Sequence, residues 1–218
     1  RKKNCVAYTR HQFSDGKHHA DRIVDPPKSL LWSFVRHPAK RDISHIFHFE
    51  ITRYGRIDVN DSQAIVNHLK TLKSFQTGYL VPTFKNRQEI RNWNNAGGSA
   101  KLLGKDGILQ TIKAKLFWDY DFLGVTDRMS ESLAVMVLLW NLNPTDVIVL
   151  SSKRSGGYDD GGGLEEQGTV CKTIAKADNL TGVIQDYLET EHMIDNVDYL
   201  LYHVANLSLD RTIQKLGI

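Results

Sequence analysis

The sequence has few of the features that assign a chain to a class at once. Its 218 residues include two cysteines, Cys5 and Cys171, which lie too far apart for a CxxC motif. They could form one disulfide or remain free thiols, and they exclude a disulfide-rich scaffold. No apolar run approaches the roughly 18 residues that a membrane-spanning helix needs. The composition, 41% hydrophobic and 24% charged, is that of a globular domain, and the length suits one hydrophobic core better than two.

Excess charge is nearly absent as well. The net charge is +3, which makes no strong electrostatic case for nucleic acid. Lys and Arg are scattered, and there is no aromatic RNA-binding motif, so we expect no nucleic-acid partner. A small basic excess suits a phosphorylated cofactor or an acidic glycan equally well.

The chain opens without a methionine and without a signal-peptide core, so we expect a segment upstream of Arg1. Sequons for N-glycosylation begin at Asn60, Asn179 and Asn206. Some sequons arise by chance in a chain with this much Asn, and Asn206 falls in an expected helix. They are a modest argument for a secretory-pathway lumen.

A strand, a tight turn and a helix follow one another near residue 36. Residues 30–35 form a short apolar run, which predicts a buried strand. Pro38 suits the first position of a helix, where its missing N–H costs nothing. Apolar residues then recur at helical spacing, so we expect a helix over 38–54 that ends at Gly55.

Further strands and helices alternate along the rest of the chain, which predicts a single α/β domain with a central parallel sheet flanked by helices. Thr126 is expected to cap an apolar helix that is buried on most sides and runs to Trp140. Residues 84–106 are polar and predict a mobile loop. The other expected helices are 61–73, 106–117, 178–190 and 195–216, and the other expected strands are 122–125 and 146–150.

A group of basic and hydroxyl residues surrounds the start of the helix at 38–54. Arg36 ends the strand, while Lys40, Arg41 and Ser44 share one helical face. A phosphate here would meet a guanidinium, a hydroxyl and a helix N-terminus. Basic residues at that terminus oppose the helix dipole, which suggests that an anion belongs there. The alternative is a solvated basic first turn.

Residues 34–44 (FVRHPAKRDIS) resemble the 3'-phosphate-binding motif of sulfotransferases that use 3'-phosphoadenosine 5'-phosphosulfate (PAPS). That motif is an apolar strand, Arg-Asp-Pro, two variable residues, Arg and a later Ser. His37 departs from it by replacing the aspartate. The resemblance implies that Arg36 and Ser44 bind the 3'-phosphate of PAPS, the co-substrate, and that no metal is required.

Two more segments, in matching order and spacing, are similar to Golgi glycan sulfotransferases of the heparan sulfate O-sulfotransferase kind. Residues 121–133 (DFLGVTDRMSESL) match one segment of these enzymes, and 198–217 look like their closing helix. The resemblance implies a P-loop-like sulfotransferase fold and transfer of a sulfuryl group to a carbohydrate hydroxyl. It also implies a polysaccharide or glycan acceptor, and a type II membrane protein of the Golgi lumen whose anchor precedes this chain.

The same resemblance implies further site residues. A His-Ala-Asp stretch makes His19 the catalytic base, with His18 as the alternative. An imidazole with a pKa near ~6.5 can accept the proton of a sugar hydroxyl. The glycine-rich loop 153–163 would fold over the nucleotide, with Lys153 and Arg154 as contacts. Its alternative is a flexible surface hairpin.

One element of the family is absent from the sequence. Nothing before His19 resembles the loop that binds the 5'-phosphosulfate, so residues 1–218 read as a sulfotransferase domain without that loop. We expect the loop in an upstream segment. The alternatives are a non-catalytic relative that binds PAP or another nucleotide phosphate, and a module that binds anionic glycans.

Overall fold

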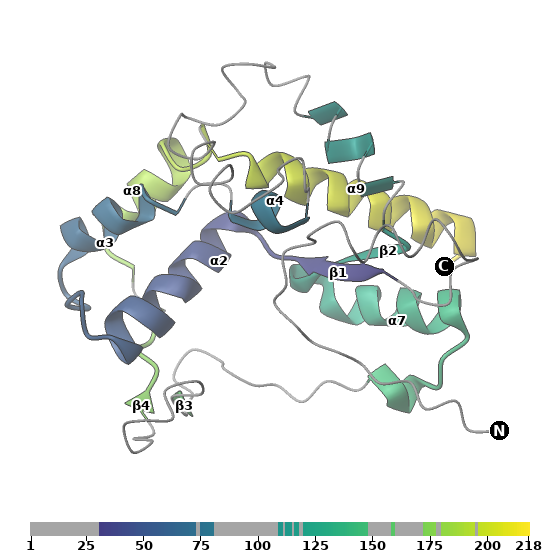
Figure 1. The fold of residues 1–218 in the computed structure, drawn as a ribbon, viewed down its shortest axis with the longest axis horizontal. Helices are drawn as coiled ribbons and strands as arrows, with labels where there is room; N and C mark the ends of the chain where they lie inside the picture. Colours follow the sequence, from purple (N-terminus) through teal and green to yellow (C-terminus); the bar gives the residue numbers. More distant parts are fainter. Residues whose placement is uncertain are drawn as a thin grey trace.

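The computed structural model describes about three fifths of the chain, which Figure 1 draws in colour. The described residues are 31–72, 75–80, 109–110, 112–114, 116–117, 120–147, 158–159, 172–177, 180–194 and 196–218. Several predictions lie outside them: His18, His19, Lys153, Arg154, Cys5, Cys171, Asn179 and the loop 84–106.

Two parallel strands lie at the centre of the larger hydrophobic core. β1 (Trp32–Val35) pairs with β2 (Phe122–Val125), in a register that runs from Trp32 opposite Phe122 to Val35 opposite Val125. A Cβ atom at Gly124 would overlap the ring of Phe34, so glycine permits the close approach of the strands. Both strands lie where the sequence predicted them, and their parallel pairing confirms an α/β arrangement.

The helix that follows β1 has two parts. α2 (Pro38–His45) continues into the π-helical segment η1 (Ile46–Arg53), with Pro38 at the start. Gly55 then adopts a φ of +60°, which glycine reaches without steric cost and which ends the helix. The structure confirms the bounds of the predicted helix 38–54, but its second part is a π-helix rather than an α-helix.

The hydrophobic residues form two clusters. In the first, β2 packs between α7 (Met129–Trp140) and α9 (Asp198–Leu216). In the second, η1 packs with α3 (Ser62–Leu69) and α8 (Gly182–Thr190). Figure 1 shows α3 and α8 side by side at one end of the molecule, while α7 and α9 flank the strands at the other. α2 leads from the first cluster to the second.

The remaining helices agree in part with expectation. Asp61 caps α3 through its side chain, but α3 ends at Leu69 and is followed by α4 (Phe75–Leu80), which the sequence did not predict. The described residues between 109 and 117 are helical. α8 and α9 lie within their predicted ranges, and α9 ends before Gly217, whose φ is +74°.

The prediction for the helix after β2 was wrong in two respects. Thr126 is not its cap, because Thr126–Arg128 form a 3-10 turn (η2) and α7 begins at Met129 without a side-chain cap. Ser132 instead bonds both peptide groups of Val125. Nor is α7 buried on most sides: Leu138 is 52% exposed, because β2 and α9 cover the other side of the helix.

The expected strand at 146–150 was also wrong at its described residues. Pro144–Val147 form a 3-10 turn (η3). The side chain of Asn143 accepts hydrogen bonds from the N–H and the hydroxyl of Thr145, and Asp146 accepts one from the N–H of Asn143. Such local side-chain bonds favour a turn over a strand.

A second, antiparallel pair joins β3 (Tyr158–Asp159) to β4 (Lys172–Thr173). β3 lies within the glycine-rich segment that the sequence predicted as a loop, so that segment is not a loop throughout. No helix among the described residues is both long and apolar enough to cross a membrane.

Candidate functional site

The end of β1 places Arg36 at the carboxyl edge of the parallel strands. Val35 is fully buried and makes the last pair of the sheet, with Val125, so the peptide groups of Arg36 lie beyond it. The side-chain amide of Gln76, from α4, takes over the pairing. Its Oε1 accepts the Arg36 N–H at 2.9 Å, and its Nε2 donates to the Arg36 carbonyl at 2.8 Å.

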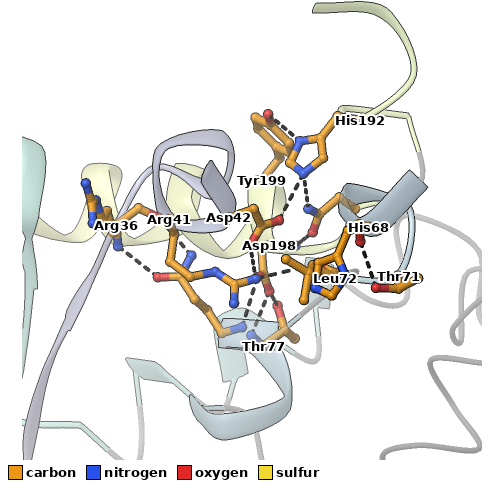
Figure 2. Close-up of polar contacts among 12 residues, drawn as sticks. Arg36, Arg41, Asp42, His68, Thr71, Leu72, Thr77, His192, Asp198 and Tyr199 are labelled. Atoms are coloured by element: carbon orange, nitrogen blue, oxygen red, sulfur yellow. Dashed lines mark hydrogen bonds and ion pairs between the residues drawn. The ribbon is translucent and has the colours of Figure 1, made fainter. Parts of the chain in front are cut away.

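The guanidinium of Arg36 is a cation without a partner among the described residues: it makes no hydrogen bond or ion pair with them. Figure 2 shows it pointing away from the polar cluster around Asp42 and Asp198. Ser44, half-buried on α2, likewise bonds none of the described side chains. Within the part of the chain that the structure describes, neither of the two side chains predicted for the 3'-phosphate has a hydrogen-bond or ion-pair partner.

The amino end of α2 already holds an anion, the carboxylate of Asp127. Its Oδ2 accepts the N–H of His37 at 3.0 Å, and its Oδ1 lies 2.5 Å from Nζ of Lys40. Burial raises the pKa of Asp127, but these hydrogen bonds outweigh burial and bring the pKa below its ordinary value. The anion expected at this helix terminus is thus supplied by the chain itself.

Arg41 points into the molecule, although the sequence grouped it with Lys40. Its guanidinium pairs with Asp42, lies 4.0 Å from Asp198 Oδ2 and stacks 4.3 Å from the ring centre of Phe75. Lys40 points to Asp127 on the other side. The two basic residues of the first turn therefore make separate contacts with carboxylates of the chain itself.

Asp198, the first residue of α9, holds the amino end of α4. One carboxylate oxygen accepts the N–H and the hydroxyl of Thr77, each at 2.7 Å, and the other accepts the N–H of Gln76 at 2.9 Å. Asp198 is fully buried, where a carboxylate needs such donors. Because α4 carries Gln76, this contact connects α9 to the end of β1 (Figure 2).

A second buried chain of polar groups crosses from α2 to α9. Asp42 Oδ2 lies 2.9 Å from Nε2 of His192, whose Nδ1 lies 3.0 Å from the hydroxyl of Tyr199. Burial raises the pKa of Asp42, and burial together with Asp42 raises the pKa of Tyr199 to about 12. Asp42 and His192 are almost inaccessible to solvent, so this chain is suited to holding the helices together rather than to contacting a substrate.

His37, which stands where the family motif has aspartate, packs edge-on against two tyrosines. Its ring centre lies 5.5 Å from that of Tyr199 and 5.2 Å from that of Tyr202. Burial lowers the pKa of His37, which favours the neutral ring. The residue directly after Arg36 is not an aspartate, but Asp127 places a carboxylate beside the same turn.

Arg36 lies just beyond the end of β1 and Ser44 lies on α2, and the polar contacts around these two elements involve residues that the sequence did not reveal. Gln76, Asp127, Asp198 and His192 carried no local signal as site residues. Within the described ranges no group of three or more His, Cys, Asp or Glu side chains could hold a metal ion. The predicted base, His19 or His18, and the loop cations Lys153 and Arg154 lie outside those ranges.

Comparisons with known proteins add no relative to this description. No protein-family model matches the chain, and neither the curated proteins nor the solved structures contain a significant match.

Proposed function

We propose that the chain binds the 3'-phosphate of PAPS through Arg36 and Ser44, as a sulfotransferase that transfers the sulfuryl group to a carbohydrate hydroxyl. The observation that carries the proposal is the guanidinium of Arg36. Arg36 directly follows a parallel strand and precedes a helix that carries the hydroxyl of Ser44, and its guanidinium makes no ion pair with another described residue. Open α/β folds bind ligands at this edge of their strands.

The geometry of α2 indicates where the phosphate would lie. At about 100° per residue, Ser44 falls between Lys40 and Arg41 around the helix axis. Asp127 occupies the donors at the helix terminus, and an additional anion there would meet its negative charge. A phosphate shared by Arg36 and Ser44 would therefore lie along the side of the first helical turns.

The chemistry proposed at this site is an in-line displacement at sulfur. The acceptor oxygen forms a bond to sulfur while the bond from sulfur to the 5'-phosphate oxygen breaks, which leaves PAP. His19, or His18 in the alternative, takes the hydroxyl proton, and Lys153 and Arg154 contact the nucleotide. Catalysis then depends mainly on positioning and on positive charge. From the resemblance of the sequence motifs we further propose that the acceptor is a glycan and that the reaction takes place in the Golgi lumen.

A transfer assay tests this proposal directly. The full encoded protein, including any sequence upstream of Arg1, is incubated with labelled PAPS and a panel of glycans. We expect labelled glycan from the wild type, and a rate about 10²–10⁴ lower from His19→Ala with PAP binding retained. Normal turnover in both His19→Ala and His18→Ala would remove both histidines as the base. Binding of PAP without transfer to any glycan would favour the non-catalytic relative, and binding of heparin oligosaccharide without PAP would favour the glycan-binding module.

A further inference from the structure

The hydrogen bonds that Arg36 makes with the described residues involve its backbone and not its side chain. Arg36 lies one residue beyond the last sheet pair, Val35 with Val125, so no strand partner remains for its N–H and carbonyl. The primary amide of Gln76 satisfies both, at 2.9 and 2.8 Å. One side chain thus replaces the neighbouring strand, and a primary amide suits this role because it combines an acceptor with a donor in the same geometry as a peptide group.

Gln76 is itself fixed from a third element. Its own N–H donates to Asp198 Oδ2 at 2.9 Å, and Asp198 is fully buried at the start of α9. The next residue, Thr77, donates to the other oxygen of the same carboxylate through both its N–H and its hydroxyl. The position of Gln76 is therefore set by the packed core and not by a mobile surface helix.

A ligand that pairs with Arg36 benefits from this arrangement. The guanidinium makes no hydrogen bond or ion pair with the described residues, so the position of the backbone has a large part in setting the direction of the side chain. Without Gln76, a bound anion would have to order this backbone as well, at a cost in affinity. The bonds of Gln76 to Arg36 thus prepare the residue for an anion before the anion arrives.

We propose that Gln76 is a positioning residue for Arg36, which prepares it to bind a nucleotide 3'-phosphate. This inference rests on the proposed function for the identity of the ligand. Its structural part, the control of Arg36 by Gln76, depends only on the contacts among β1, α4 and α9.

The first test measures PAP affinity by calorimetry. Gln76→Ala should bind PAP about tenfold more weakly than the wild type, as expected when one residue must be ordered on binding. Gln76→Glu, which keeps the length but cannot donate to the Arg36 carbonyl, should also weaken binding. Gln185→Ala, at an exposed position on α8, is the matched control and should leave affinity unchanged.

A double variant shows whether Gln76 acts through Arg36. In the Arg36→Ala background, adding Gln76→Ala should cause no further loss of PAP affinity, because the group being positioned is gone. Losses that add in full would overturn the positioning role, since Gln76 would then act on its own. The Glu substitution in the same background checks the result in case the Ala substitution destabilises α4.

Hydrogen exchange without nucleotide tests the same contact independently of the ligand. The Arg36 amide should exchange faster in Gln76→Ala, while the Arg41 amide, which bonds the His37 carbonyl at 2.9 Å, should keep its wild-type rate. Unchanged Arg36 exchange would overturn the inference. If exchange responds but the wild type does not bind PAP, the contact stands and the proposed function fails.

Discussion

Asp127 and Lys40 meet at the amino end of α2, where Oδ1 of the carboxylate lies 2.5 Å from Nζ of the lysine. The other oxygen of Asp127 accepts the His37 N–H. A carboxylate from the turn after β2 thereby stabilises a helix that begins after β1. Because this contact already pairs Lys40 with an anion, the proposed function assigns the nucleotide phosphate to Arg36 and Ser44.

The stability of the fold should depend on the charge of Asp127. Its pKa lies below the ordinary 3.8, so its contribution is present above that value and is lost as pH falls through the folded-state pKa. Asp127→Asn should lower the free energy of unfolding by about 1 kcal/mol at neutral pH. As pH falls below about 4, the free energy of unfolding should decrease less in Asp127→Asn than in the wild type. Denaturant titration across pH measures both effects, with Asp186→Asn on α8 as the exposed control. Parallel pH curves for wild type and Asp127→Asn would contradict the role of the carboxylate.

His37 should make the protein less stable in mild acid. Burial lowers its pKa from 6.5, with Lys40 and His192 acting in the same direction and Asp127 opposing them. Its contribution to stability is therefore present above pH 6.5 and lost as pH falls through the folded-state pKa. His37→Phe preserves the ring between Tyr199 and Tyr202 but has no group that titrates. Between pH 7 and pH 5 its free energy of unfolding should therefore fall less than that of the wild type. His203→Gln, at an exposed position, should follow the wild type. A His37→Phe curve that also follows the wild type would show that His37 does not cause the loss.

The buried pair of Asp42 and His192 should matter more than an exposed pair nearby. Removing His192 takes one buried hydrogen-bond partner from Asp42, which keeps its ion pair with Arg41, and such a loss typically costs about 1–3 kcal/mol. His192→Ala should therefore lower the free energy of unfolding by about that amount. Glu191→Ala, which removes a 3.6 Å contact between exposed Lys70 and Glu191, should cost under about 1 kcal/mol. Similar losses for the two variants would mean that the Asp42–His192 contact contributes little.

If the protein passes through the secretory pathway, its N-glycosylation sequons should not all carry a glycan. Asn60 lies exposed in the turn before α3. Asn206 is half-buried within α9, where its side chain donates to the Tyr202 carbonyl and lies 3.5 Å from Arg128. After secretion from a eukaryotic host, deglycosylation should shift the mass of the wild type but not of a variant that combines Asn60→Gln with Asn179→Gln. A glycan retained by that double variant would have to be on Asn206 and would contradict this placement.

The part of the fold that the sequence predicted depends on local patterns. Short apolar runs predicted β1 and β2, and Pro38 with Gly55 set the two ends of the long helix. α4 escaped prediction because it is short and contains Gly78, a poor helix former, and because it depends on a carboxylate more than a hundred residues away in the chain. The π-helical winding of Ile46–Arg53 likewise has no local signal that we recognise.

The residues of the candidate site fall into the same two groups, those predicted from local patterns and those that depend on tertiary contacts. Arg36 and Ser44 were predicted because they belong to one contiguous motif. Asp127 lies within the segment 121–133 that resembles the family, but its position at the α2 terminus requires the pairing of β1 with β2. Gln76 contacts Arg36, and His192 contacts Asp42, only through tertiary packing, and nothing in the neighbouring residues indicated either contact.

The most direct test of the account compares two nucleotides that differ in one group. Calorimetry with PAP and with AMP, which lacks the 3'-phosphate, isolates the contribution of that phosphate. Arg36→Ala should weaken PAP binding by about 1.5–3 kcal/mol and leave AMP binding unchanged. Arg56→Ala, at an exposed arginine after η1, should alter neither. Equal PAP affinity for the wild type and Arg36→Ala would contradict the assignment of the 3'-phosphate to this residue.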